Sequence, residues 1–466
     1  MKKTAKELQK ELTWDFQHLG KNKTSDKEKA FLYCEGYKDF LDRAKTEREF
    51  VEQAEAFLKS AGYKVYEFGR NYLPGDRVYF VNRGKSVIMT TFGTAPLEEG
   101  IRLNISHIDS PRLDLKPNPL YEKNELAYLK THYYGGIRKY QWVTIPLAMH
   151  GIVIKKDGSA VNVCIGEKAG DPVFCVTDLL PHLGAKQNER KLSEGIKGEE
   201  LNILVGSLPF IDADDEIKDA VKLNTLVLLH EYYGITEKDF LRAEIEFVPA
   251  VKAADVGLDR SIVGAYGQDD RVCAYTSLTA AVEVKNPYYT AVTVFADKEE
   301  IGSYGTTGLN SDFVLHYIED LAVGEKANVR KVLRNTLAVS SDVSAAYDPT
   351  FDFVYESRNS FFLNKGVGLT KYTGARGKSG ASDASAETMA RLIDIMDNAG
   401  VCWQAGEMGA VDEGGGGTVA LYVAAMNVDV VDLGVPLLCM HSPFELASKY
   451  DVYNAHKAFV AFLSSK

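Results

Sequence analysis

Two adjacent glutamates, Glu299 and Glu300, follow an apolar run in the stretch YTAVTVFADKEEIGS. Adjacent carboxylates repel one another, and such a pair on a protein surface is usually only solvated. At the end of a buried strand the two groups can instead divide their work, one binding a metal ion and the other accepting a proton. The pair therefore predicts a hydrolytic site if other metal ligands lie beside it.

Four more stretches place His or Asp where a predicted strand ends or a predicted helix begins. They are NISHIDSPR with His107 and Asp109, AYGQDDRVCAY with Asp269 and Asp270, LAVSSDVSAA with Asp342, and LLCMHSPFE with His441. Ligands of open α/β sheets bind beyond the carboxyl ends of the strands, so we expect these groups to meet. Each alone has a simpler interpretation, since a lone His is often structural and Asp270 could be only a helix N-cap.

Two imidazoles and several carboxylates packed together would raise the carboxyl pKa values unless cations lay between them. Two divalent ions, three carboxylates and one bridging hydroxide would together carry no net charge. Mixed nitrogen and oxygen ligands favour zinc, with cobalt and manganese as alternatives. The expected chemistry is hydrolysis by a metal-activated water, with one uncoordinated glutamate as the general base.

The elements that must position these groups differ along the chain. Residues 5–62 carry apolar side chains at helical spacing and predict two or three helices. After residue 250, strand-like runs such as YTAVTVFA alternate with helix-like runs such as SAETMARLIDIMDNA. This alternation predicts an α/β fold, specifically an α/β/α sandwich with a mixed, mainly parallel central sheet.

Residues 115–250 have a different composition, with many Tyr, Gly and Thr residues and short β-like runs such as QWVTIPLAMHGIVI. We therefore expect a catalytic α/β domain made of residues 1–114 and 251–466, interrupted by a β-rich insert over residues 115–250.

The composition excludes several classes of partner. The chain has 466 residues and a net charge of −11, which disfavours binding to nucleic acid or anionic lipid. Its six cysteines form no CxxC pair, and no apolar run is long enough to span a bilayer. We expect a cytoplasmic protein with reduced thiols and no membrane partner.

The motifs SHIDSPR, QDDR, DKEEIGS, SSDVSAAYDP and MHSPFE resemble, in this order, those of the aspartyl aminopeptidase family of dinuclear zinc aminopeptidases. The likeness extends from the N-terminal helices to the C-terminus, and DEGGGGTVA resembles the family's glycine-rich segment. The resemblance implies two zinc ions held by His107 and Asp342, by Glu300 and His441, and by a bridging Asp269. It also implies that Glu299 is the general base and that Asp109 orients the metal-bound His107.

The resemblance further implies an assembly. In the family the β-rich insert mediates dimer formation, and dimers assemble into a tetrahedral dodecamer. The segment IPLAMH is similar to one that sends a histidine into a neighbouring active site, which makes His150 a candidate catalytic residue. A core or interface role for His150 is the alternative.

The expected substrate is a peptide with a free N-terminus. The family commonly prefers an acidic first residue, which requires a cation in the side-chain pocket, and Lys371 lies where the family places such a lysine. Arg376 or Lys378 could serve instead. Asp348 stands where the family often has a histidine, and an acid there disfavours an acidic substrate, so a neutral preference stays open.

Two other functions stay open from the sequence alone. One keeps the metal site but makes the protein a deacylase or carboxypeptidase. The other is a non-catalytic peptide-binding or scaffolding homologue with a vestigial site.

Overall fold

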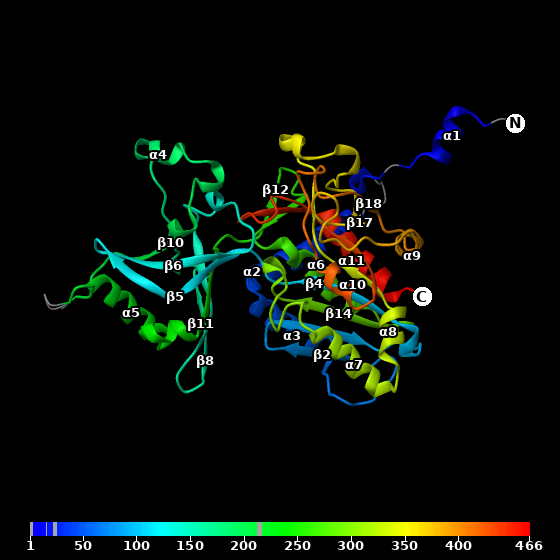
Figure 1. The fold of residues 1–466 in the computed structure, drawn as a ribbon, viewed down its shortest axis with the longest axis horizontal. Coiled ribbons are helices and arrows are strands. Elements are labelled where there is room, and N and C mark those ends of the chain that lie inside the picture. Colours follow the sequence, from blue (N-terminus) through cyan, green and yellow to red (C-terminus); the bar gives the residue numbers. More distant parts are fainter. Residues whose placement is uncertain (1–2, 15, 22–25, 212–216) are drawn as a thin grey trace.

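The computed structural model describes residues 3–14, 16–21, 26–211 and 217–466. Within this part of the chain the strands form a nine-stranded, a seven-stranded and a five-stranded sheet. Figure 1 shows the seven-stranded sheet on the left, beside a larger part that contains the N- and C-terminal portions of the chain. The protein therefore has a mixed α/β fold with several sheets.

The nine-stranded sheet has the order β1-β2-β3-β14-β4-β15-β19-β17-β18. Strands β14, β4, β15 and β19 are parallel neighbours, β3 and β17 pair antiparallel to this group, and β2 pairs antiparallel to β3. All seven residues of β14 are buried, as expected for a strand covered on both faces. The bounds are β1 (Lys64–Val65), β2 (Arg77–Asn82), β3 (Ser86–Thr91), β4 (Ile101–His107), β14 (Thr290–Ala296), β15 (Leu337–Ser340), β17 (Val367–Thr370), β18 (Trp403–Ala405) and β19 (Asp429–Gly434).

Helices pack on both faces of this sheet. Along β14, Phe295 belongs to one apolar cluster and Val294 to a second, because successive side chains point to opposite faces. The first cluster includes residues of α2 (Lys27–Arg43), α3 (Glu47–Ser60), α6 (Gln268–Glu283), α9 (Ala386–Asn398) and α11 (Lys449–Ser464). The second includes residues of α7 (Phe313–Glu325), α8 (Val329–Asn335) and α10 (Ala420–Ala425).

The seven-stranded sheet is antiparallel and has its own apolar core, in which Trp142 and Phe247 are fully buried. Its order is β8-β7-β11-β5-β6-β10-β9. The bounds are β5 (Arg112–Lys123), β6 (Leu126–Tyr134), β7 (Leu147–Ile154), β8 (Ala160–Ile165), β9 (Cys175–Val176), β10 (Asn202–Gly206) and β11 (Ala243–Pro249), with helices α4 (Ala185–Asn188) and α5 (Ala220–Tyr233). These strands lie between residues 112 and 249, close to the range predicted to be β-rich.

The five-stranded sheet joins short segments from distant parts of the chain. Its order is β12 (Ala254–Val256), β13 (Ile262–Ala265), β21 (Glu445–Ser448), β20 (Pro436–Leu438) and β16 (Ser344–Ala345). Strand β13 leads into α6, and β20 and β21 flank His441. This sheet therefore brings two of the predicted motifs together.

The N-terminal region contains α1 (Ala5–Leu12), α2 and α3, as the helical spacing predicted. A capping box between Thr46 and Glu49 begins α3. No helix of the described residues combines the length and the apolar character that crossing a membrane requires.

Candidate metal centre

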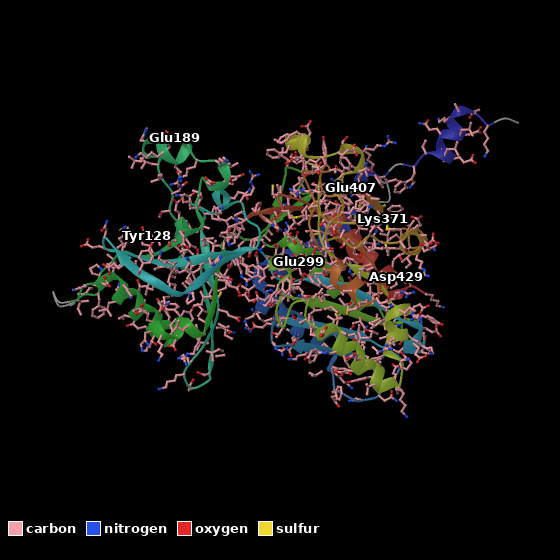
Figure 2. All side chains as sticks on the ribbon, in the orientation of Figure 1. Tyr128, Glu189, Glu299, Lys371, Glu407 and Asp429 are labelled. Atoms are coloured by element: carbon pink, nitrogen blue, oxygen red, sulfur yellow. The ribbon has the colours of Figure 1, made fainter. Side chains whose placement is uncertain are left out.

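Five chain segments converge beyond one edge of the nine-stranded sheet. His107 ends β4, Glu299 and Glu300 lie in the turn after β14, and Asp342 follows β15. These three strands are adjacent and parallel, so their carboxyl ends meet at one edge. Figure 2 shows Glu299 on the side of the α/β part that faces the seven-stranded sheet.

Asp269, near the start of α6, lies between the two histidines. Its Oδ1 is 3.1 Å from Nε2 of His107, and its Oδ2 is 3.1 Å from Nε2 of His441. Nε2 of His441 is also 3.3 Å from Oε1 of Glu300, and Nε2 of His107 is 3.7 Å from Oδ1 of Asp342. The predicted metal ligands thus form two groups that share Asp269.

Both imidazoles use their Nδ1 atoms for hydrogen bonds that face away from Asp269. Nδ1 of His107 is 3.1 Å from the carbonyl oxygen of Asp109 and 3.3 Å from its Oδ1. Nδ1 of His441 is 2.7 Å from the carbonyl oxygen of Gly136. If each Nδ1 donates, each Nε2 lone pair points at carboxylate oxygens, the arrangement of a histidine ready to bind metal.

The donor set fits divalent metal ions. Lone pairs aimed at carboxylates repel them unless a proton or a metal ion lies between, and Oε1 of Glu300 is buried without a hydrogen-bond partner. Burial and the neighbouring Asp269 raise the pKa of Glu300 well above its usual value. A bound cation would remove the cost of ionising Glu300, and nitrogen and oxygen donors of this kind suit zinc.

Asp109 connects one histidine to the glutamate pair. Its buried carboxylate accepts the backbone N–H of Glu299 at 3.1 Å and that of Glu300 at 3.2 Å. Burial raises the pKa of Glu299 to about 8, and Asp342 and Asp109 add to this rise against the opposing effect of His107. A raised pKa favours the uptake of a proton, which is the task of a general base, and bound cations would lower this pKa.

Two further acids complete the centre. Glu445, which the sequence reasoning missed, accepts the backbone N–H groups of His441 and Asp269; its only sequence signal was its place at the end of MHSPFE. Asp270 is fully buried and follows Asp269 through a cis peptide bond. The backbone of Asp270 is not helical, and neither of its carboxylate oxygens has a hydrogen-bond partner, so its side chain does not cap the helix that follows.

His150 lies outside this cluster. It is 2% exposed on β7, with Nδ1 2.6 Å from Oε1 of Glu49 and Nε2 3.1 Å from Oε1 of Glu167. Both ring nitrogens therefore already have partners in the same subunit.

The three candidate pocket cations lie in the loop after β17. Nζ of Lys371 is 2.5 Å from Oδ1 of Asp383, and Nζ of Lys378 is 3.1 Å from Oδ2 of the same residue. Arg376 lines a small hollow together with Lys378 and Glu407. Figure 2 shows Lys371 and Glu407 to the right of Glu299, on the α/β part of the molecule.

A mixed α/β fold with histidines and carboxylates gathered at its strand ends is typical of a metal-dependent hydrolase. Residues 40–463 match the family described as Aminopeptidase I zinc metalloprotease (M18). The chain therefore belongs to the M18 family, and the protein is a metallo-aminopeptidase.

Individual relatives agree with this. The chain is 49% identical over 454 residues to a probable M18 family aminopeptidase 1 of Clostridium acetobutylicum, covering 95% of this chain and 97% of the relative. The crystal structure of an M18 aminopeptidase from Thermotoga maritima superposes with a TM-score of 0.92 at 42% identity, covering 97% of this chain and 100% of that chain. Aminopeptidase I from Clostridium acetobutylicum gives a TM-score of 0.90 at 45% identity, with the same coverage.

Proposed function

We propose that the protein removes N-terminal residues from peptides by means of two divalent metal ions, with zinc preferred over cobalt and manganese. One observation carries this proposal: the two carboxylate oxygens of Asp269 each lie 3.1 Å from Nε2 of a different histidine. A carboxylate placed between two imidazoles in this way could bind two metal ions at once.

Each residue has a proposed role. His107 and Asp342 would hold one ion, Glu300 and His441 would hold the other, and Asp269 would contact both. Bound ions would activate a water and polarise the carbonyl of the scissile bond. Glu299 would take a proton from the water as its oxygen bonds to the carbonyl carbon, and would give that proton to the amine as the C–N bond breaks, while Asp109 orients the ring of His107.

The free amine of the substrate is held by carboxylates of the site, so the activity depends on an unblocked N-terminus. A deacylase or carboxypeptidase with the same site would cleave a peptide whose amine is acetylated, whereas an aminopeptidase would not. A scaffolding homologue would bind metal and cleave neither form.

The preferred substrate is a peptide whose first residue is acidic, and a peptide whose first residue is neutral is the alternative. Lys371 and Lys378 together carry two positive charges against the one negative charge of Asp383. This excess of cationic charge supports an acidic preference, because a substrate carboxylate could replace part of the contact with Asp383.

The quaternary proposal is a homo-oligomer in which dimers assemble into a tetrahedral dodecamer. The catalytic part is an α/β/α sandwich of residues 1–114 and 251–466, located in the cytoplasm, and the insert of residues 115–250 forms the dimer contact. Exposed leucines in that insert support a contact: Leu179, Leu180, Leu183 and Leu192. A yeast protein described as the mApe1 dodecamer shares the fold at 19% identity with a TM-score of 0.76.

The test compares Glu299→Gln with Glu300→Gln. The first variant should keep two ions per subunit and lose most turnover, because it removes the base and preserves the shape. The second should lose metal.

Glu231→Gln, at an exposed position of α5, is the matched control and should behave as wild type. Near-normal turnover of Glu299→Gln would contradict the assigned base, and metal-free wild-type protein would contradict the dinuclear site.

A further inference from the structure

We propose that the segment Tyr134–Gly136 is a positioning segment that sets the metal affinity of the dinuclear centre. The inference rests on the proposed function, because it takes His107, Glu300 and His441 as metal ligands. The segment belongs to the end of β6 and the residues after it, and so comes from the seven-stranded sheet. Through its contacts with the centre, the seven-stranded sheet would influence how tightly the metal ions bind.

Tyr134 fixes the carboxylate that fixes His107. Its hydroxyl donates to Oδ2 of Asp109 at 2.8 Å, and the tyrosine side chain is buried. Asp109 Oδ1 is near Nδ1 of His107 and accepts the N–H of Glu299, while Oδ2 also accepts the N–H of Glu300. The hydroxyl therefore supplies the hydrogen bond that holds this carboxylate from the side of the seven-stranded sheet.

The next two residues contact the other half of the centre. The carbonyl oxygen of Gly136 lies 2.7 Å from Nδ1 of His441 and accepts a hydrogen bond from it. Gly135 has φ +74°, and a Cβ there would lie 3.2 Å from Oε2 and 3.3 Å from Cβ of Glu300. Glycine is suited to this position because it adopts a positive φ without strain and lets the backbone approach the glutamate. One short segment thus touches groups at both proposed metal positions.

The segment is itself held in place by a buried ion network. The guanidinium of Arg112, on β5, lies 3.9 Å from the centre of the Tyr134 ring. Arg112 in turn contacts Glu47 of α3 at 3.4 Å, Asp114 at 2.9 Å and Glu246 of β11 at 3.3 Å. The position of the Tyr134 hydroxyl is therefore set by charges on both the α/β part and the seven-stranded sheet.

Loss of the Tyr134 hydroxyl should weaken metal binding more than it destabilises the fold. Tyr134→Phe keeps the ring and its contact with Arg112, and removes only the hydrogen bond to Asp109. Asp109 then keeps the backbone N–H groups of Glu299 and Glu300 as its donors, but its carboxylate is held less firmly, and so is the imidazole of His107. Mutation of a group that contacts a metal ligand directly typically weakens metal affinity by about 10- to 100-fold, and Tyr134 acts one contact further out through Asp109, so we expect the lower end of this range.

The experiment measures the zinc dissociation constants of wild type, Tyr134→Phe and Tyr133→Phe by competition with a chromogenic chelator. Tyr133, the neighbouring residue on β6, is 39% exposed and serves as the matched control. The absorption spectrum of the cobalt-substituted proteins reports ligand geometry separately from activity. Peptide hydrolysis at saturating zinc gives kcat and KM, and far-UV circular dichroism of the metal-free proteins checks the fold.

We expect Tyr134→Phe to bind at least one zinc ion about tenfold more weakly and to show an altered cobalt spectrum. Its kcat should fall, while its KM stays within about twofold of wild type. Tyr133→Phe should match wild type throughout. Unchanged zinc dissociation constants in Tyr134→Phe, with two ions in wild type, would overturn this inference and leave the proposed function intact. Wild-type protein that binds no zinc would instead overturn the proposed function, and with it the inference.

Discussion

The buried carboxylate of Glu445 accepts the backbone N–H of Asp269 at 3.0 Å. Its other oxygen accepts the backbone N–H of His441 at 2.7 Å, and the residue is only 1% exposed on β21. One side chain thus holds the main chain at the shared carboxylate and at one of the two histidines. Because each oxygen has its own donor, both must act as acceptors.

Glu445→Gln should therefore destabilise the protein and weaken metal binding together. A carboxamide has one acceptor oxygen, so its NH₂ group would face one of the two backbone N–H groups. Leaving a buried donor unpaired costs about 1–3 kcal/mol. Urea unfolding at fixed zinc concentration and metal analysis would measure both effects. Glu231→Gln, on the exposed side of α5, is the control, and a Glu445→Gln variant with wild-type midpoint and metal content would contradict the prediction.

Removal of the metal should lower the stability of the whole catalytic part. Without cations, Asp269, Glu300 and Asp342 are three acids confined in one buried space, and their mutual repulsion opposes ionisation. Zinc at about 100 times its dissociation constant should raise the free energy of unfolding by about 2.7 kcal/mol per independent site. Thermal unfolding of chelated and zinc-loaded protein, with magnesium as the control cation, would measure this. Equal midpoints in chelator and in zinc would contradict the prediction.

The sequence was sufficient to predict which side chains would meet at the sheet edge. Glu300 follows a largely apolar run and His107 follows the alternating stretch IRLNIS. Parallel strands bring their last residues to one edge of the sheet whatever the length of chain between them. The helical spacing of the N-terminal region and the alternation after residue 250 also corresponded to real elements. These features are local, because they depend on residues that are close in the sequence.

The contacts that hold the site could not be predicted in this way. Glu445 accepts hydrogen bonds from backbone N–H groups, and Gly136 accepts one through its own carbonyl oxygen. Such backbone hydrogen bonds cannot be recognised from the types of residue in the sequence. The five-stranded sheet joins strands of two to four residues from distant parts of the chain, which is too short for periodicity to identify. His150 is held by Glu49 and Glu167, neither of which is near it in sequence. Reaching another subunit would require His150 to break both contacts.

The shared acid Asp383 gives a test of the substrate pocket. If Lys371 and Lys378 select the first residue of the substrate, Asp383→Asn should free their charge for a substrate carboxylate. The ratio of kcat/KM for Asp and Glu substrates to that for Ala and Leu substrates should rise by about two- to fivefold, the range expected for partly exposed ion pairs. Lys371→Gln and Lys378→Gln should lower the same ratio.

A panel of aminoacyl chromogenic substrates with zinc, cobalt or manganese, and a chelated control, would provide these ratios. Asp394→Asn, at an exposed position of α9, controls for a general change in net charge. An unchanged ratio in all three loop variants would exclude this loop from the pocket and leave the hydrolytic mechanism unaffected.

Asp451, a buried residue of α11, should make stability depend on pH. Burial raises the pKa of Asp451 to about 7, against the opposing effect of the backbone N–H groups of Gly366 and Asn364. The folded protein then binds this proton more tightly than the unfolded chain, in which the pKa is near 3.8. Between these two values the folded state carries more protons, so the free energy of unfolding falls as the pH rises. This loss of stability is absent at a pH well below the pKa of Asp451 in the unfolded chain. It is complete at a pH above the pKa of Asp451 in the folded protein.

Asp451→Asn removes this titration but leaves one backbone donor without an acceptor, so it should be less stable than wild type at low pH. The difference in the free energy of unfolding between wild type and Asp451→Asn should narrow by about 1–3 kcal/mol from about pH 5 to about pH 8. Only wild type loses stability through Asp451 as the pH rises. Denaturant unfolding across this range would measure the gap, with the exposed Asp394→Asn as a control whose difference from wild type stays constant. A gap that stayed constant or widened would mean that the two N–H donors keep Asp451 ionised in the fold, and that hydrogen bonding outweighs burial at this position.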